Sequence, residues 1–241
     1  MMSLSIVIPC KNESEIIHKT VEHIHNNLKK TNINFEIILI NDFSNDNTET
    51  VLKSLQNKYP TVVYYNNSKI GLGSAISLGI NKSQKKYLVI FMADMSDDIN
   101  DLIKYHEMIS KKNLDSIFGS RFLKNSKIID YPIFKLILNR IFNNFVRIIF
   151  LTKFNDFTNA FKIYKVDTLK ELLPIVSENF NTFLELPLKI LSRGYSFEII
   201  SINWTNRKLG SSKFKVKELT SKYIFTLIYC FLEKNLLKKR K

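Results

Sequence analysis

Carboxylates and amides directly follow three apolar segments of this chain, in positions that could bind a charged ligand. The segments LSIVI, FEIILI and YLVIFM read as strands, because they are short, apolar and rich in β-branched residues. The polar residues that follow them include Asn12, Glu13, Asp42 and Asp94. In open α/β sheets, ligands bind at the carboxyl ends of the strands. Three such ends at one edge predict a site for a nucleotide and a metal ion.

Asp42 is the candidate for recognising the nucleotide. It stands at the tip of the second strand, where a carboxylate can accept hydrogen bonds from a base such as uracil or guanine. Pro9 and Glu13 lie at the neighbouring strand tip and frame the same pocket. Asp46 and Thr48 come later, where such residues usually cap the next helix. A solvated loop carboxylate is the alternative for Asp42 itself.

The acidic turn after the third segment is the candidate metal site. Asp94 follows the strand, and Ser96, Asp97 and Asp98 come next. Oxygen ligands at this spacing suit Mg²⁺ or Mn²⁺, which also bind a diphosphate. A helix dipole favours carboxylates at the start of the helix, so capping is the alternative for Asp97 and Asp98. Asp94 is therefore the first choice as a ligand.

Basic residues supply candidates for binding phosphate. They are Arg121 after a short strand, Arg140 in an apolar helix, and Arg207, Lys208 and Lys213 in a loop with glycine and serine. Arginine binds phosphate through two parallel hydrogen bonds. A solvated basic loop is the alternative for the last three. Gly71-Leu72-Gly73 lacks the rest of a P-loop or dinucleotide fingerprint, and it predicts a backbone turn near the nucleotide.

The elements that must position these residues alternate between strand and helix up to about residue 130. Strands are expected at 4–8, 35–40, 61–65, 87–92 and 115–118, with helices at about 13–30, 47–58, 73–82 and 99–111. Helices at 166–176 and 181–193 and a strand at 197–202 follow later. The alternation predicts an α/β fold with a mostly parallel sheet covered by helices on both faces.

Two further segments predict amphipathic helices. Segment 133–151 is apolar except for a narrow polar stripe, and the tail from 216 contains an apolar run before Lys238-Lys239-Arg240-Lys241. Both fit helices that lie in the interface of an anionic membrane. Packing against the catalytic domain or against a second copy of the chain is the alternative, which leaves a homo-oligomer open. We expect a catalytic domain over 1–215 and an amphipathic, basic tail over 216–241.

The net charge and the cysteine content indicate which kind of partner the chain binds and which cellular compartment it occupies. The net charge of +14 favours an anionic partner, although a lysine-rich composition would give the same excess. Cys10 and Cys230 imply no disulfide framework and fit a reducing compartment. No signal peptide is visible, and no apolar run reaches the roughly 18 to 20 residues that cross a bilayer. We expect a cytoplasmic protein held peripherally at the cytoplasmic face of a membrane, with no nucleic acid partner because no such motif is present.

Six motifs in order resemble family 2 glycosyltransferases with a GT-A fold. Within that family the chain is similar to the dolichyl-phosphate and polyprenyl-phosphate sugar synthases, which include mannosyltransferases. Segment 9–13 (PCKNE) resembles the family's Pro-x-x-Asn-Glu, 41–48 (NDFSNDNT) its Asp-Asp-x-Ser-x-Asp-x-Thr, and 71–73 (GLG) its Gly-Leu-Gly. Segment 119–121 (GSR) resembles its Gly-Ser-Arg, 156–162 (DFTNAFK) its Asp-x-x-Ser-Gly-Phe, and 207–213 (RKLGSSK) its Arg-x-x-Gly-x-Ser-Lys. The resemblance covers roughly residues 3–215.

The resemblance implies inverting transfer of a sugar from a nucleotide sugar, GDP-mannose or a UDP-sugar, to a dolichyl or undecaprenyl phosphate. It implies that the nucleotide sugar is bound by Pro9, Asn12, Glu13, Asp42, Gly71, Ala93 and Asp94. The acceptor or phosphate would be bound by Arg121, Arg140, Arg207 and Lys213. The implied catalytic set is Asp94, Arg121, Arg207 and Asp156. Mg²⁺ or Mn²⁺ would be held by Asp94 and Ser96, with Asp97 or Asp98 in addition.

Three positions depart from the family pattern. Met92 occupies the first position of the family's Asp-x-Asp, and Ser96 stands where a glutamine is often the third metal contact. Asn41 replaces the first acidic residue of the nucleotide motif, while Asp42 remains. These departures leave the metal stoichiometry open.

The acceptor decides whether a base is needed. A lipid phosphate is already anionic near neutral pH, so catalysis would consist of positioning and charge neutralisation. A glycan hydroxyl, as in polysaccharide or cell-envelope synthesis, would require a carboxylate base, with Asp156 or Glu185 as candidates. A third hypothesis is a degenerate module that only binds a nucleotide or a membrane. Met92 favours it, and the retained Asp94 and Arg121 argue against it.

Overall fold

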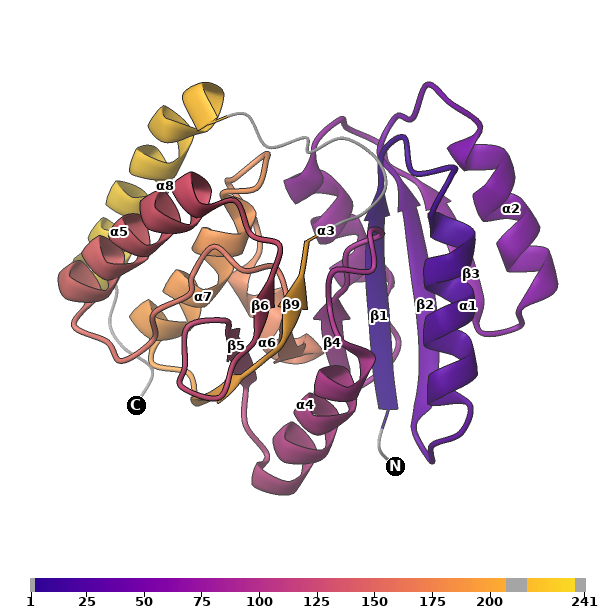
Figure 1. Cartoon of the computed structure of the whole chain (residues 1–241), viewed down its shortest axis with the longest axis horizontal. Helices are drawn as coiled ribbons and strands as arrows, with labels where there is room; N and C mark the ends of the chain where they lie inside the picture. Colours follow the sequence, from indigo (N-terminus) through magenta and orange to yellow (C-terminus); the bar gives the residue numbers. More distant parts are fainter. Residues whose placement is uncertain (1–2, 207–215, 237–241) are drawn as a thin grey trace.

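A seven-stranded sheet runs through the molecule in the order β3-β2-β1-β4-β7-β5-β8 (Figure 1). The computed structural model describes residues 3–206 and 216–236, with side chains from residue 221 in the last helix. The strands of the sheet are β1 (Ser3–Cys10), β2 (Asn34–Asn41), β3 (Val62–Asn66), β4 (Tyr87–Ile90), β5 (Ser116–Ser120), β7 (Lys162–Lys165) and β8 (Phe197–Ser201). Only β7 is antiparallel to its neighbours among these strands. A separate two-stranded parallel sheet pairs β6 (Ile128–Ile129) with β9 (Trp204–Thr205).

Helices cover both faces of the large sheet. One face carries α1 (Ile17–Leu28), α2 (Thr48–Lys58) and α4 (Ile99–Lys112), and the other carries α3 (Leu72–Lys82), α6 (Val166–Leu172) and α7 (Thr182–Arg193). At the end of the molecule farthest from α2, α5 (Ile133–Phe150) lies beside α8 (Val216–Leu236) (Figure 1). Phe142 and Phe150 of α5 meet Tyr223 and Phe231 of α8 edge to face.

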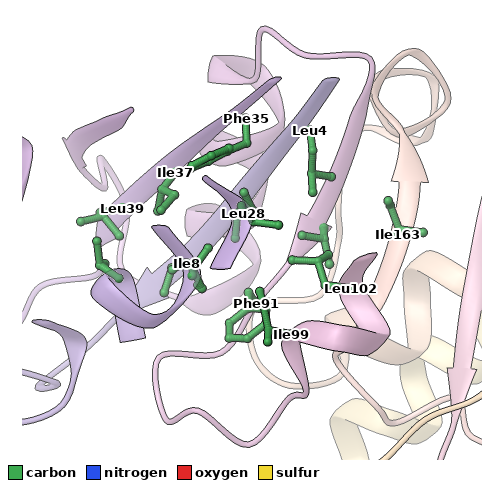
Figure 2. Packing of buried hydrophobic residues seen from close by; sticks show 14 of the residues in the cluster. Leu4, Ile8, Leu28, Phe35, Ile37, Leu39, Phe91, Ile99, Leu102 and Ile163 are labelled. Atoms are coloured by element: carbon green, nitrogen blue, oxygen red, sulfur yellow. The ribbon is translucent and has the colours of Figure 1, made fainter. Parts of the chain in front are cut away.

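The central strand explains why the sheet has two cores. Leu4, Ile6 and Ile8 of β1 belong to one buried cluster, and Val7 points to the cluster on the opposite face. Figure 2 shows the first cluster, in which residues of β1 and β2 pack against α1 and α4. A strand buried on both faces reads as a continuous apolar run, which is typical of parallel sheets. The predicted α/β fold with a mostly parallel, helix-covered sheet is confirmed.

The strands that sequence patterns miss are short. β6 and β9 have two residues each, and β7 is the tetrapeptide KIYK, which has no apolar periodicity to mark it. The helix expected at 166–176 ends at Leu172 because Pro174 follows, and the residue before a proline is restricted to extended conformations. Among the described residues, no helix is both long and apolar enough to cross a bilayer.

Candidate active site

The carboxyl ends of β1, β2 and β4 meet at one edge of the sheet. β1 pairs in parallel with β2 on one side and with β4 on the other. Asp42 follows β2 directly, and Asp94 lies in the turn after β4. Since neighbouring strands are about 5 Å apart, the two strand ends that carry these carboxylates are about 10 Å apart. The structure therefore brings Asp42 and Asp94 to the two sides of the end of β1.

Asp42 is buried and shapes the turn around Gly71. Its Oδ1 accepts hydrogen bonds from Asn67 Nδ2 and from the Gly71 amide, both at 2.8 Å. Gly71 has φ +131°, a conformation that L side chains rarely adopt, so glycine is required here. The second carboxylate oxygen, Oδ2, has no hydrogen-bond partner among the described residues, which leaves it for a ligand. The turn predicted near the nucleotide is present.

The segments after β1 and β2 form a loop pair, residues 10–14 and 42–48, joined by hydrogen bonds. The Asn12 amide donates to Ser44 Oγ at 3.0 Å, and Asn12 Oδ1 accepts from the Asn45 amide at 2.8 Å. The Glu13 amide donates to Thr48 Oγ1 at 2.8 Å. Asn12 adopts a positive φ of 51°, which asparagine tolerates better than most residues. These bonds fix the backbone on which Asn12 and Glu13 were expected to bind a nucleotide sugar.

Asp46 joins the loop pair rather than filling the site. It accepts hydrogen bonds from the Thr48 amide at 3.0 Å and from Ser14 Oγ at 2.7 Å. The little burial it has works to raise its pKa, but the bonds from Thr48 and Ser14 outweigh this and lower the pKa to about 2. The capping role expected of Asp46 and Thr48 is wrong: the N-cap of α2 is Asn47, which makes no side-chain cap bond, and Thr48 is the first residue of the helix. Asp46 instead binds the amide of that first residue, and the same carboxylate also holds the neighbouring loop.

Asp94 sits in a tight turn that leads into α4. Asp94 Oδ1 accepts from the Ser96 amide at 3.1 Å, and Met95 between them has φ 57°. Asp98 Oδ1 accepts from the Asn100 amide at 2.8 Å, which makes Asp98 the N-cap of α4. The carboxylate of Asp98 therefore serves the helix. Ala93, before the turn, is buried, and its carbonyl accepts from Thr20 Oγ1 at 2.5 Å.

Asp97 is a buried carboxylate with one unsatisfied oxygen. The residue is 6% exposed, and Asp97 Oδ2 has no hydrogen-bond partner within the part of the chain that the structure describes. Burial, and next the charge of Asp94, raise the pKa of Asp97 to about 8. Asp97 faces Arg121 and Lys162 as well, whose positive charges oppose that shift.

Arg121 and Asp156 form a buried, two-pronged ion pair. Arg121 Nε donates to Asp156 Oδ2 and Arg121 Nη2 donates to Asp156 Oδ1, both at 2.8 Å. The Arg121 amide donates to Asp156 Oδ2 as well, at 2.9 Å. Burial works to lower the pKa of Arg121, but the charge and hydrogen bonds of Asp156 outweigh it and raise the pKa. Asp156 is thus committed to orienting the guanidinium, a geometry that does not fit the base considered for it.

Aromatic rings surround the remaining surface of Arg121. Its guanidinium carbon lies 5.4 Å from the centre of the Phe122 ring, 5.7 Å from that of Tyr131 and 5.6 Å from that of Trp204. The guanidinium carbon of Arg140, on α5, lies 4.6 Å from the centre of the same Phe122 ring. The structure therefore brings Arg121 and Arg140 together against one phenylalanine. The Nη1 group of Arg121 makes no hydrogen bond to the described residues and can donate to a ligand.

Lys162 completes a charged cluster, which consists of Asp97, Arg121, Asp156 and Lys162. Lys162 is 1% exposed, and its Nζ donates to the carbonyls of Phe157, at 3.0 Å, and Asn159. Burial lowers the pKa of Lys162 to about 7, with Asp156 acting in the opposite direction. Lys162 thereby holds the loop that carries Asp156.

Asn139 and Asn143 of the polar stripe predicted on helix α5 face the protein, whereas Arg140 and Arg147 of the same stripe are exposed. Asn143 is buried, and its Oδ1 accepts from the Phe157 amide at 2.6 Å. Asn139 Nδ2 donates to Thr158 Oγ1 at 3.1 Å. The opposite side of α5 is exposed and apolar, with exposed fractions of 62% for Ile141 and 53% for Phe145. The helix is amphipathic as predicted, with its apolar side turned outward.

Three predicted phosphate-binding residues and the basic cluster Lys238-Lys239-Arg240-Lys241 lie outside the described part of the chain, and one alternative base is committed elsewhere. Arg207 and Lys213, expected to bind phosphate, fall in residues 207–215, and Lys208 falls there as well. Glu185, the second candidate for a base, pairs with Lys189 at 2.7 Å and accepts from the Ser177 amide at 2.7 Å. Both members of that pair are buried.

The residues after β4 fit a divalent cation. Within the described ranges no group of three histidines, cysteines or carboxylates is arranged as a complete ligand set. Asp94 and Asp97 nevertheless place two carboxylates close together, and Asp97 Oδ2 is a buried oxygen without a partner. Mg²⁺ and Mn²⁺ take few protein carboxylates and complete their shell with water and phosphate oxygens. Ser96 is buried in the same turn.

Sequence patterns miss Asn67 and Lys162. Asn67 bridges Asp42 and Ser74, whose hydroxyl donates to Asn67 Oδ1 at 3.0 Å. Asn66 ends β3 and Asn67 follows it, so the rule that led to Asp42 and Asp94 could have found them. Lys162 lies inside an unrecognised strand, and lysine is rarely buried, so no local signal marks it. Gly119 of the Gly-Ser-Arg motif is explained by packing, since a Cβ there would lie 1.8 Å from the Tyr105 hydroxyl.

Comparisons with known proteins agree on one family. The family model described as glycosyl transferase family 2 matches residues 5–173. A dolichol-phosphate mannosyltransferase of Pyrococcus furiosus is 27% identical over 224 residues, which cover 90% of this chain and 61% of that protein. The chain thus spans about three fifths of the length of this relative. A polyprenol monophosphomannose synthase of Mycolicibacterium smegmatis is 25% identical, with 86% of this chain and 79% of that protein covered.

Solved structures share the fold at low sequence identity. Glucosyl-3-phosphoglycerate synthase from Mycobacterium tuberculosis, crystallised with Mn²⁺, UDP-glucose and phosphoglyceric acid, superposes with a TM-score of 0.70 at 13% identity. The match covers 95% of this chain and 79% of that one. The same enzyme with UDP gives a TM-score of 0.68 at 14% identity, with coverages of 95% and 80%. At this identity the likeness establishes the arrangement of the sheet and helices.

Proposed function

This chain belongs to glycosyl transferase family 2, and we propose that it is a glycosyltransferase that transfers a sugar from a nucleoside diphosphate sugar to a polyprenyl phosphate. The proposal rests above all on Arg121 and Arg140, which meet at Phe122 where the polar edge of the sheet adjoins the exposed apolar helix α5. An acceptor with an anionic head and an apolar tail requires such a junction. The names of the two curated relatives point to the same acceptor class.

The donor lies across the end of β1 in this proposal. Asp42 Oδ2 accepts from the base, with Pro9, Asn12 and Glu13 lining one side and the Gly71 turn the other. Asp94 lies on the far side of β1, where the diphosphate would be. The base is left open between guanine and uracil, since both present N–H donors to a carboxylate.

The committed carboxylates favour a phosphate over a hydroxyl acceptor. A hydroxyl needs a base, and both candidates considered from the sequence, Asp156 and Glu185, are held in buried ion pairs. A phosphate monoester oxygen is already anionic near neutral pH. Arg121, oriented by Asp156, and Arg140 then bind and orient the acceptor phosphate. Arg207 and Lys213 remain candidates for the same role.

The reaction is a single in-line displacement with inversion. An oxygen of the acceptor phosphate forms a bond to the anomeric carbon of the sugar. The bond from that carbon to the diphosphate oxygen breaks, and its electron pair leaves with the nucleoside diphosphate. A bound Mg²⁺ or Mn²⁺ would neutralise charge on the leaving diphosphate as a Lewis acid. The chain positions the two reactants on opposite faces of the sugar, with Asp94 on the donor side and Arg121 on the acceptor side.

A membrane surface is the proposed docking partner of the apolar face, which we define as the exposed apolar residues of α5 and α8. These are Ile133, Phe134, Ile137, Leu138, Ile141, Phe145, Ile148, Ile224, Phe225, Ile228, Phe231, Leu232 and Leu236. Exposed Arg140 and Arg147 accompany them on α5, and the chain carries a net charge of +14. Apolar helices with cationic side chains bind the interface of anionic membranes. The cytoplasmic face of such a membrane is its proposed location.

A donor screen with a matched acceptor pair tests the proposed reaction. The full chain is incubated with radiolabelled GDP-mannose or UDP-sugars, a divalent cation, and either a short polyprenyl phosphate or the corresponding polyprenol. We expect label in the organic phase with the phosphate and none with the alcohol. Label transferred only to soluble or glycan hydroxyls would replace this proposal with the glycan alternative.

Charge substitutions on the apolar face test the docking. Ile141→Glu with Phe145→Glu should weaken binding to vesicles containing phosphatidylglycerol at least tenfold, because each change removes about 1 to 2 kcal/mol of apolar burial. Ser54→Glu with Asn57→Glu on α2 makes the same charge change at the opposite end of the molecule (Figure 1) and should bind as the wild type. If the two double variants bind vesicles equally well, the apolar face does not contact the membrane. If the wild type is a dimer that dissociates on substitution of Ile141 and Phe145, the apolar face is a contact between two copies of the chain.

A further inference from the structure

The turn after β4 carries one carboxylate where the family pattern has two. Position 92 holds Met92, whose side chain is partly buried against the apolar cluster beneath α3 and α7. A thioether packed in a core is not a ligand for a hard cation such as Mg²⁺. Asp98 is committed to capping α4. A second carboxylate for Asp94 therefore has to come from another position.

Asp97 is held at the end of β4 by two separate elements. Its backbone pairs with Trp204 in an antiparallel bridge, and the Thr205 amide donates to the Ser96 carbonyl at 3.3 Å. On the other side α4 begins with Asp98 as its cap. The left-handed turn at Met95 brings the chain back toward the strand end, where the Met92 amide interacts with the Asp97 carboxylate. Asp97 thus lies against the backbone of Met92, the residue that departs from the family's Asp-x-Asp pattern.

The cations of the charged cluster leave Asp97 Oδ2 unsatisfied. Arg121 Nε and Nη2 donate to Asp156, and Lys162 donates to two backbone carbonyls. A buried oxygen without a partner has a cost in folding free energy. Such a cost is recovered when a ligand occupies the position, and the negative charge of neighbouring Asp94 selects a cation as that ligand.

We propose that Asp97, together with Asp94, holds the divalent cation, so that its carboxylate replaces the one missing at position 92. This inference rests on the proposed nucleotide-sugar donor, whose diphosphate supplies the other oxygen ligands. Relative to the family pattern, the second carboxylate has moved from position 92 to position 97, which β9 and α4 hold in place.

Counting bound Mn²⁺ tests this without any turnover. Free Mn²⁺ is measured by electron paramagnetic resonance in titrations of the full-length wild type and of Asp97→Asn, Asp94→Asn and Asp98→Asn. We expect Asp97→Asn and Asp94→Asn each to weaken Mn²⁺ binding at least tenfold, and Asp98→Asn to change it less than twofold. Wild-type affinity in Asp97→Asn, or an equal loss in Asp98→Asn, would overturn the assignment.

A measurement on the wild type keeps the test independent of variant folding. Trp204 is the single tryptophan of the chain and pairs with Asp97 through its backbone. Mn²⁺, but not Mg²⁺, should broaden its indole N–H resonance at substoichiometric concentration. An unaffected indole signal with Mn²⁺ bound would place the cation elsewhere. If sugar transfer to polyprenyl phosphate is observed but the cation is bound by residues other than Asp94 and Asp97, this inference is refuted and the proposed function stands.

Discussion

The loop pair and the charged cluster lie at the same edge of the sheet but are built in different ways. In the loop pair, backbone amides of Asn12 and Glu13 donate to side chains of the neighbouring loop, and exposed Asp46 joins both loops. In the charged cluster, four ionisable side chains are buried together, and one carboxylate oxygen of Asp97 stays without a partner among the described residues. The loop pair is held by hydrogen bonds between two adjacent loops, and the charged cluster contains more charge than its own bonds satisfy.

This difference matches the two tasks proposed for the site. A donor that is bound through a base and a diphosphate needs a rigid frame, which hydrogen bonds between adjacent loops supply. An acceptor phosphate and a cation need oriented charges in a dry environment, where electrostatic interactions are strong. Buried charges cost stability unless they are paired. The charged cluster, with Asp94 beside Asp97, should therefore respond to substitution more strongly than the loop pair. Substitutions at Asp156, Asp94, Asp42 and Asp46 can test this.

The largest effect on stability is expected at the buried ion pair. Asp156→Asn leaves the Arg121 guanidinium buried without its counter-charge, which should lower the free energy of unfolding by about 3 to 5 kcal/mol. Denaturant unfolding of the full chain measures this. Glu198→Gln removes the exposed Lys112–Glu198 pair as a control and should cost less than about 1 kcal/mol. Similar losses of stability from both substitutions would show that the buried ion pair contributes no more than an exposed one.

The largest effect on turnover is expected at Asp94. Asp94→Ala should reduce sugar transfer about a thousandfold, because stabilisation of the leaving diphosphate contributes several kcal/mol to the transition state. The reduction should appear in kcat as well as in kcat/KM. Transfer assays with and without a chelator measure the same dependence in the wild type. Full wild-type activity in the presence of chelator would refute a metal site.

A smaller effect is expected at Asp42, in the region of the loop pair. Asp42→Ala removes an acceptor for the base and also releases Asn67 and the Gly71 amide. Nucleotide affinity, measured by calorimetry, should fall about 10- to 100-fold, the value of one or two charge-assisted hydrogen bonds. Asn67→Ala, which loosens the same turn while leaving the carboxylate, should lose less. If affinity is unchanged in Asp42→Ala, the base is bound elsewhere.

The smallest effect is expected at Asp46, and it depends on pH. The pKa of Asp46 is lowered to about 2 in the folded chain from its ordinary value of 3.8, so its contribution to stability is present above that ordinary value. It is lost as the pH falls through the folded value. Since Asp46 is exposed, the contribution should stay below about 1 kcal/mol. Unfolding curves of Asp46→Asn and wild type at pH 7 should differ by that amount and converge as the pH approaches 2; a constant difference would contradict this origin.

The loop pair could be predicted largely from the sequence, and the charged cluster only in part. Asp42, Asp94 and the Gly71 turn follow strands that apolar runs reveal, and parallel pairing brings such strand ends together. Asp97 was named only beside Asp98 as an additional metal ligand, and Lys162 was not predicted at all. Their surroundings depend on contacts with residues 121, 156 and 204, far along the chain. Helix α5 was predicted, but its polar stripe did not reveal that Asn143 would turn inward to the Phe157 amide.

The sequence by itself determined the alternating strands and helices, the polar residues at the strand ends and the family, since these depend on local periodicity and short spacing. Only the tertiary structure decided which carboxylates are committed. It paired Asp156 with Arg121, Asp98 with the start of α4, and Asp97 with no described hydrogen-bond donor for Oδ2. The physical reason is that burial and partner, which set the charge state of an ionisable group, arise when distant segments pack together.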